Sequence, residues 1–138
     1  MEAWCPLDSL WSRLPPGRVT VASIAGLDET VIATIHRHVE PVAQQRFRAV
    51  TVISFAGDVD RDTAPYLDRA LHRAVSGGMP VCCDLGRVGF FGAAGARVML
   101  SAVRHSRAVG GTFLLRGVPS IPLRVLEVAG IDHSLIIG

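Results

Sequence analysis

Residues 83–95, with the sequence CDLGRVGFFGAAG, decide the fold and most of the functional interpretation of this chain. An apolar stretch passes through a glycine-rich segment into a helical pattern, which predicts a buried strand, a tight turn and a helix that begins at Gly95. The first N–H groups of such a helix lack intrahelical partners and lie at the positive end of its dipole, so the turn suits a phosphate, a carboxylate or an acidic side chain of a partner. Gly92, Ala93 and Ala94 carry no nucleophile, acid or metal ligand. We therefore expect the turn to bind rather than to catalyse, and we predict no catalytic residue and no enzyme activity.

The same residues resemble the signature of the STAS family, Asp-Leu-x-x-Val-x-Phe-x-Asp-Ser-Ser-Gly followed by a helix. The matching positions are Asp84, Leu85, Val88, Phe90 and Gly95. Upstream, residues 50–57 (VTVISFAG) and 58–64 (DVDRDTA) are similar to the family's strand, its Gly-Glu-x-Asp turn and the start of its helix. The resemblance covers residues 32–138, which divides the chain into an N-terminal extension, 1–31, and a STAS-like domain, 32–138.

The STAS family includes bacterial anti-sigma factor antagonists and the tails of sulfate transporters. In the antagonists, a partner kinase phosphorylates a serine of the Asp-Ser-Ser triplet, and the phosphate releases the partner. Here the triplet is replaced by Gly92, Ala93 and Ala94, and the position of the serine falls on Ala93. Because alanine accepts no phosphate, the resemblance implies a binding surface that lacks the usual phosphorylation switch.

Strand and helix patterns alternate over the C-terminal two-thirds of the chain. Apolar and β-branched runs predict strands at 49–55, 79–85, 112–115 and 135–137. Apolar residues at helical spacing predict helices from Thr63 to the glycines at 77 and 78, from 95 to 109, and from 122 to 129. Thr63 is the expected cap of the first helix, with Pro65 in its first turn. Together with the resemblance, this alternation predicts an α/β fold: a STAS-like mixed β-sheet of about four to five strands with helices packed on it.

The N-terminal third permits more than one interpretation. Residues 31–39 fit either a strand or a helix, and the family resemblance favours a strand that forms a hairpin with 49–55. Residues 19–26 (VTVASIAG) echo 50–57, which indicates either two strands of similar composition or an extra strand that extends the sheet or pairs with a second copy in a homodimer. Both tryptophans of the chain, Trp4 and Trp11, lie in a segment before residue 15. We expect that tryptophan-containing segment to dock on the domain or on a partner.

The composition excludes several classes of protein. A chain of 138 residues, 49% of them hydrophobic, has the size of one domain and can bury a core without disulfides or metals. A net charge of +2 and an aromatic content of 6% argue against nucleic-acid binding. The apolar runs are shorter than the roughly 18 residues of a membrane span, and the N-terminus lacks the pattern of a signal peptide. We therefore expect a cytoplasmic protein that does not bind the membrane, and the resemblance to anti-sigma factor antagonists implies a bacterial one.

Two groups of side chains have the elements of a metal site but not its spacing. The alternating carboxylates of residues 58–62 lack the glycine and the distant glutamate of an EF-hand loop, so they predict a solvated turn. Two histidines on one face of a strand could bind zinc with a cysteine, yet no zinc-site spacing is present. The residues concerned are Asp58, Asp60, Asp62, His36, His38, Cys82 and Cys83. We predict no metal and no cofactor.

The resemblance implies a protein-interaction module whose partner is an anti-sigma factor of the kinase-like type. The predicted binding residues belong to the 58–63 loop and to the start of the second helix: Asp58, Asp60, Arg61, Thr63, Gly92, Ala93, Ala94, Gly95 and Arg97. A row formed by Arg97, Arg104 and Arg107 is either a solvated helix face or a patch for acidic residues of a partner. Two alternatives remain: a sensor that holds a nucleotide phosphate or another anion at Gly92–Gly95, and a structural subunit that oligomerises through Trp4, Trp11 and an edge strand.

Overall fold

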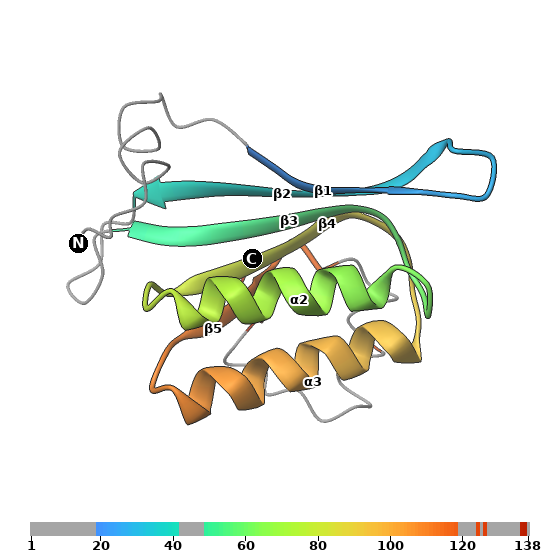
Figure 1. Ribbon diagram of the computed structural model, residues 1–138. Helices are drawn as coiled ribbons and strands as arrows, with labels where there is room; N and C mark the ends of the chain where they lie inside the picture. Colours follow the sequence, from blue (N-terminus) through green and yellow to red (C-terminus); the bar gives the residue numbers. More distant parts are fainter. Residues whose placement is uncertain (1–18, 42–48, 119–123, 125, 127–135, 138) are drawn as a thin grey trace.

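The computed structural model describes residues 19–41, 49–118, 124, 126, 136 and 137. Their elements, in chain order, are β1 (Val19–Ala25), β2 (Val31–Pro41), β3 (Ala49–Val59), α2 (Ala64–Ser76), β4 (Val81–Phe91), α3 (Ala93–Ala108), β5 (Phe113–Arg116) and β6 (Ile136–Ile137). Both helices lie side by side on the same face of the sheet (Figure 1). Trp4, Trp11 and most of the helix predicted at 122–129 fall outside the described residues.

The strands form one mixed sheet in the order β1-β2-β3-β4-β5-β6. β1 and β2 pair antiparallel, as do β2 and β3, whereas β3, β4, β5 and β6 are parallel to one another. The predicted α/β fold with a mixed sheet is confirmed, and its described sheet has six strands because β1 is added to the five predicted ones, of which the last is the two-residue β6. Residues 31–41 are the strand that the family resemblance favoured, and β1 is the extra strand that extends the sheet at its edge.

The main core lies between the sheet and the two helices. Alternate residues of β3 and β4 point toward the helices and are fully buried, among them Ile53, Phe55 and Leu85, and they meet Leu71 of α2 and Met99 of α3. The other face of the sheet, which we call the far face, carries a smaller apolar cluster made by Val50, Val52, Cys82 and Leu114. The central strands are apolar at nearly every position because they are buried on both faces.

Three predicted boundaries are wrong, because glycines were interpreted as turn residues. β3 continues past the expected end at Phe55, through Gly57, to Val59. β4 continues past the expected end at Leu85 to Phe91. A Cβ on Gly86 would lie 3.1 Å from Oδ1 of Asp84, and one on Gly89 would lie 2.7 Å from Oδ1 of Asp58, so these glycines make room for carboxylates within the strand.

The helix after β4 begins at Ala93 rather than at Gly95, and Gly92 is its N-cap residue. Gly95 is buried in the first turn, where a Cβ would lie 2.8 Å from the ring of Phe91, so its role is close packing and not helix initiation.

Among the described residues, no helix is long and apolar enough to cross a lipid bilayer.

Candidate functional site

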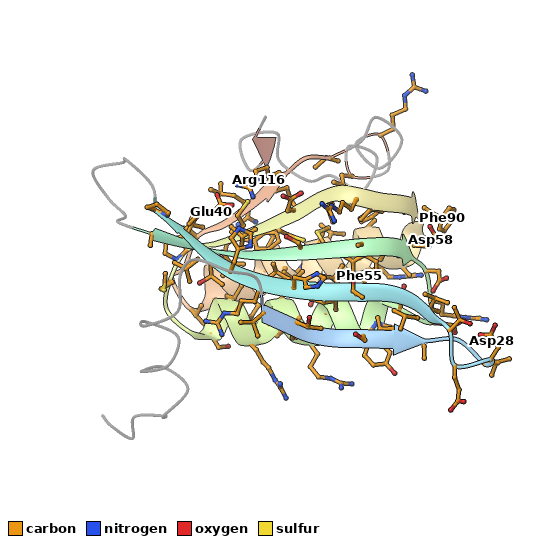
Figure 2. All side chains as sticks on the ribbon, turned by 90° about the horizontal axis from the view of Figure 1, so that it is seen from above. Asp28, Glu40, Phe55, Asp58, Phe90 and Arg116 are labelled. Carbon is orange, nitrogen blue, oxygen red and sulfur yellow. The ribbon has the colours of Figure 1, made fainter. Side chains whose placement is uncertain are left out.

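The two segments predicted to bind a partner lie at the same end of the sheet. β3 and β4 are parallel neighbours, so their C-terminal ends are adjacent, and each leads directly into a helix (Figure 1). Oδ1 of Asp58 accepts a hydrogen bond of 2.8 Å from the backbone N–H of Phe90, and the two residues lie together at this end in Figure 2. The N–H of Gly92 donates to the carbonyl of Val59 over 3.3 Å. The end of β3 and the start of α3 are therefore joined into one surface.

The 58–63 loop is held by its own side chains. Oδ1 of Asp60 accepts hydrogen bonds from the N–H groups of Asp62 (2.9 Å) and Thr63 (3.0 Å). These bonds, that of Thr63 first, lower the pKa of the Asp60 carboxyl. The hydroxyl of Thr63 donates to the carbonyl of Asp58 over 2.6 Å and accepts from the N–H of Asp60 over 3.0 Å. Thr63 is the N-cap residue of α2, as predicted, although its side chain makes no capping hydrogen bond to the helix. Instead it is buried and fixes the loop.

The side chains that remain free to meet a partner are fewer than predicted. In the loop they are Arg61 and Asp62, both exposed. At the start of α3, Ala93 is exposed, Ala94 is half-buried and Arg97 is exposed, whereas Gly95 is buried. We call these free side chains, together with the exposed pair Asp58 and Phe90 that joins the two segments, the helix-start surface. Its members are Asp58, Arg61, Asp62, Phe90, Ala93, Ala94 and Arg97.

Two members of this surface, Asp62 and Phe90, were not among the predicted binding residues, and Phe90 also lies outside the two predicted segments. Its side chain is 56% exposed, although the neighbouring Phe91 is buried in the main core. Consecutive residues of a strand point to opposite faces, so two adjacent phenylalanines in β4 put one ring outward. The two adjacent phenylalanines could have indicated this outward ring from the sequence, but the segment was interpreted as a turn. An exposed aromatic ring beside the bare start of a helix is typical of a protein-binding surface.

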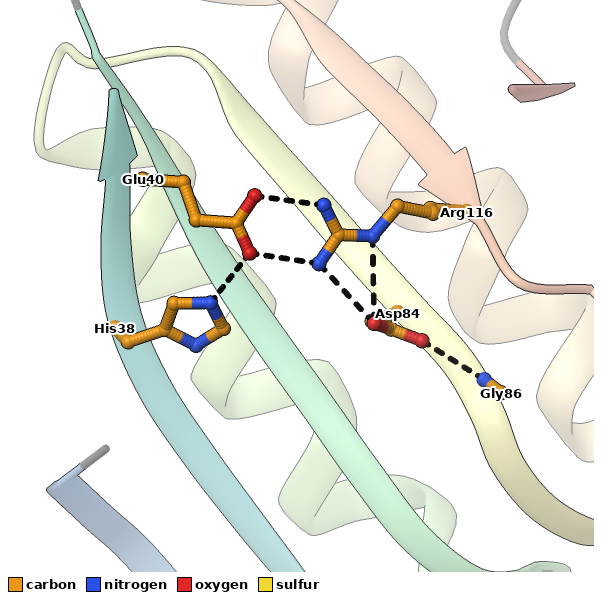
Figure 3. A network of polar contacts seen from close by, with 5 residues as sticks. All are labelled: His38, Glu40, Asp84, Gly86 and Arg116. Carbon is orange, nitrogen blue, oxygen red and sulfur yellow. Dashed lines mark hydrogen bonds and ion pairs between the residues drawn. The ribbon is translucent and has the colours of Figure 1, made fainter. Parts of the chain in front are cut away.

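A network of charged side chains crosses the far face (Figure 3). The guanidinium of Arg116 in β5 binds both carboxylate oxygens of Glu40 in β2, at 2.8 and 2.9 Å. The same guanidinium donates to Oδ2 of Asp84 in β4 at 3.2 and 3.3 Å. His38 Nε2 lies 2.6 Å from Glu40, and Oδ1 of Asp84 accepts from the N–H of Gly86 at 2.9 Å. We call these four side chains, His38, Glu40, Asp84 and Arg116, the far-face network.

In this chain the first aspartate of the signature, Asp84, belongs to the far-face network. Asp84 orients the strand at Gly86 and holds Arg116, so its role is structural and it lies outside the helix-start surface. Hydrogen bonds from Arg116, and then from His38, hold the pKa of Glu40 at about 2, and the bond to Glu40 raises the pKa of Arg116. Glu40 and Arg116 are therefore both charged at neutral pH and form an ion pair across the far face.

The cysteines and histidines considered for a metal site do not come together. Cys82 belongs to the far-face cluster, whereas Cys83 points into the main core. Burial raises the pKa of Cys82 to about 11 and also raises that of Cys83, so both thiols are protonated at neutral pH and are poor ligands and nucleophiles. Over the described ranges, no group of three His, Cys, Asp or Glu residues converges on a point where a metal ion could be held.

Comparison with known proteins establishes the family. Residues 42–138 match the family model described as "Mlab, STAS domain", and the chain therefore belongs to the STAS domain family. This confirms the resemblance of residues 83–95 to the STAS signature. No curated protein sequence matches the chain.

Several solved structures share the fold. An anti-sigma factor antagonist from Mycobacterium paratuberculosis is 23% identical with a TM-score of 0.58, over 82% of this chain and 89% of that one. The anti-sigma factor antagonist SpoIIAA in its unphosphorylated form is 18% identical with a TM-score of 0.56, over 73% and 85%. RsbS from Moorella thermoacetica is 16% identical with a TM-score of 0.54, over 71% and 80%.

Proposed function

We propose that the chain is a regulatory binding protein of the anti-sigma factor antagonist type, acting in the bacterial cytoplasm, and that it binds an anti-sigma factor through the helix-start surface. The observation that carries the proposal is the hydrogen bond from Phe90 N–H to the Asp58 carboxylate, because it joins the loop and the start of α3 into one contact area. This area combines an exposed ring, small alanines and charges of both signs. Such a composition suits the contact of one folded protein with another.

Binding of this kind regulates by competition. An anti-sigma factor that is occupied by the antagonist cannot hold its sigma factor, so the sigma factor is released. In a phosphorylated antagonist, a phosphate at the start of the second helix would place about two negative charges in this contact and prevent docking. Ala93 stands exposed at that position and has no hydroxyl. Phosphorylation at this position therefore cannot switch the contact off in this chain. Binding to the anti-sigma factor is instead controlled by the expression level, by the N-terminal segment or by another phosphosite.

The test begins with capture of partners from the source cytoplasm on the immobilised full chain, followed by mass spectrometry. The proposal expects an anti-sigma factor with a kinase-like ATPase domain among the captured proteins. Its affinity is then measured by calorimetry against two variants that alter the helix-start surface. Ala94→Glu places a bulky charge at the start of α3, and Asp62→Arg reverses a charge in the loop. Asp62 is preferred to Asp60, because Asp60 holds the loop together.

Arg73→Glu is the matched control, since Arg73 is exposed near the end of α2 and lies far along the helix from its start. We expect both surface variants to weaken binding by at least about tenfold and the control to change it less than about twofold. Unchanged affinity for both surface variants would refute the proposed contact.

The anion-sensor alternative predicts a different pattern. Ala94→Glu would also displace a bound anion, but Asp62→Arg adds a positive charge and would leave anion binding unchanged or strengthen it. Titration of inorganic phosphate and of ADP and GTP into the same variants separates the two functions. Tight nucleotide binding by the unmodified chain, strengthened in Asp62→Arg, would favour the sensor.

A further inference from the structure

A groove follows the seam between α2 and α3. Two hollows of about 420 and 500 Å³ lie along it, and both are lined by Arg97 and Ser101, so they join end to end. The first begins at Ala94, in the helix-start surface, and the second reaches His105. The distance from Ala94 to His105 along α3 is about 16 Å, because a helix rises about 1.5 Å per residue. We call this feature the interhelical groove; it has the length of about three helical turns.

The rim of the groove is positively charged and not neutralised. The two helices contain five arginines and a single carboxylate, Asp68. Asp68 lies 3.4 Å from the imidazole of His72. Three arginines line the groove, Arg61, Arg97 and Arg104, and within the described residues none of them has an ion-pair partner. Asp68 lines the first hollow, whereas the second hollow has Arg97 and Arg104 in its lining and no carboxylate, so negative charge on an occupant is favoured most in the second hollow.

The floor of the groove is apolar and its walls are fixed. Ala64 and Ala94 line the first hollow and Leu100 lines the second. The rings of His72 and His105 stack across the seam with centroids 4.5 Å apart, and Nε2 of His105 lies 2.9 Å from Oγ of Ser76. These contacts between α2 and α3 keep the far end of the groove at a constant width. An apolar floor beside the arginines of α3 fits an amphipathic helix that has an apolar stripe and acidic residues next to it.

We infer that the interhelical groove binds an acidic amphipathic helix of the partner protein, as a second contact beyond the helix-start surface. The inference deepens the proposed function and rests on it for the identity of the partner, because the groove opens into the helix-start surface at Ala94. The chemistry of the groove can be tested without that partner. A partner so bound touches the start of the helices, where charges of both signs are exposed, and the second hollow, where Arg97 and Arg104 are the charged lining residues with no carboxylate beside them.

The probe is a synthetic peptide of about 14 residues, roughly four helical turns, with leucines on one face, glutamates on both flanks and blocked termini. A matched peptide has lysine in place of each glutamate. Binding to the full chain is followed by fluorescence anisotropy. We expect the glutamate peptide to bind at least about tenfold more tightly than the lysine peptide, and its affinity to fall as salt is raised, because the attraction is between surface charges.

Two variants locate the binding within the groove. Arg104→Glu reverses a charge in the second hollow, and Ser101→Trp fills the point where the hollows meet. Each should weaken the glutamate peptide by at least about tenfold, and Arg73→Glu, whose side chain lines a different hollow beside Val21 and Tyr66, should change it less than about twofold. Circular dichroism and thermal melting confirm that each variant is folded. Equal binding of the two peptides, or equal loss in Arg104→Glu and Arg73→Glu, would overturn the inference.

The same variants separate this inference from the proposed function. If Arg104→Glu binds the captured anti-sigma factor normally while Ala94→Glu does not, the groove is not a partner contact and the proposed function stands. If the glutamate peptide binds in the groove but no anti-sigma factor binds the chain, the groove chemistry stands and the proposed function fails.

Discussion

The carboxylate of Asp58 lies against Gly89 and accepts the backbone N–H of Phe90, so the end of β3 is fixed to the end of β4 by a side chain and not only by strand pairing. Glycine at position 89 is what allows the approach, since a Cβ there would lie 2.7 Å from the carboxylate oxygen. The relative position of the loop and of the start of α3 therefore depends on this contact.

Removal of that carboxylate should loosen the junction. We expect Asp58→Ala to lower the free energy of unfolding by about 0.5–1.5 kcal/mol, the usual net value of one hydrogen bond. Asp62→Ala is the control, because its carboxylate is exposed in the same loop and it should change stability by less than about 0.5 kcal/mol. Urea denaturation followed by circular dichroism measures both. Equal stability of the two variants would show that the Asp58 contact is not needed.

The family phosphosite can be restored with little effect on the fold. Gly92 has φ −99° and ψ −164°, an extended conformation open to any residue, and it is the N-cap of α3. Its Cβ would approach only the exposed ring of Phe90, at 3.0 Å, and that ring can turn away. Gly92→Asp with Ala93→Ser should therefore shift stability by no more than about 1 kcal/mol, measured by thermal melting.

The same double variant should become a substrate for the kinase activity of a captured anti-sigma factor. After incubation with ATP, mass spectrometry is expected to find phosphate on the new serine, whereas the unmodified chain and the single variant Gly92→Asp take none within residues 90–97. Phosphate on the unmodified chain in this segment would show that the alignment of Ala93 with the family serine is wrong.

Core packing under α2 can be probed at Leu71, whose side chain is fully buried between the helix and the sheet. Leu71→Ala removes apolar contacts and leaves a cavity, so it should lower the free energy of unfolding by about 2–5 kcal/mol. Arg73→Ala, two positions later and exposed, should change it by less than about 0.5 kcal/mol. A small effect at Leu71 in the same denaturation experiment would contradict the packing of α2.

The far-face network should make stability depend on acid pH. The pKa of Glu40 is about 2 in the folded chain and 4.5 without its partners, so the unfolded chain takes up the proton first. The contribution of Glu40 is complete above pH 4.5 and is lost as the pH falls toward 2. Solvent screening of this partly exposed group makes the contribution small.

We expect Glu40→Gln to flatten the loss of stability between about pH 5 and pH 3. Glu29→Gln is the control, because Glu29 is exposed at the tip of the β1–β2 hairpin. The free energy of unfolding is measured by denaturant titration across this pH range. A profile for Glu40→Gln that is parallel to that of the unmodified chain would show that the network does not contribute.

The sequence was sufficient to predict features that local patterns determine. Helical spacing with Pro65 and Gly77 placed α2 correctly, and the β-branched runs placed β3 and β5 within a few residues. Glycines were the main source of error, because Gly86 and Gly89 have the composition of a turn but lie in a strand. Glycine stands at these positions because a Cβ on Gly86 would crowd the carboxylate of Asp84, and one on Gly89 would crowd the carboxylate of Asp58. Asp58 belongs to another strand, so the local sequence of β4 does not reveal this contact.

The far-face network could not be predicted at all. Arg116 and Glu40 are 76 residues apart, and nothing in either local segment indicates that they meet. Their contact follows from the strand order and from the register of β2, β3, β4 and β5, which are properties of the assembled sheet.

The position of Arg116 also has a kinetic consequence. Arg116 in β5 reaches Glu40 in β2 only when β2, β3, β4 and β5 have all paired in register, so this contact cannot form before those four strands have assembled. Interactions that form after the folding transition state leave the folding rate unchanged and slow unfolding. The Arg116 contacts, which form late in folding, thus lower the unfolding rate and lengthen the lifetime of the folded chain without raising the folding rate.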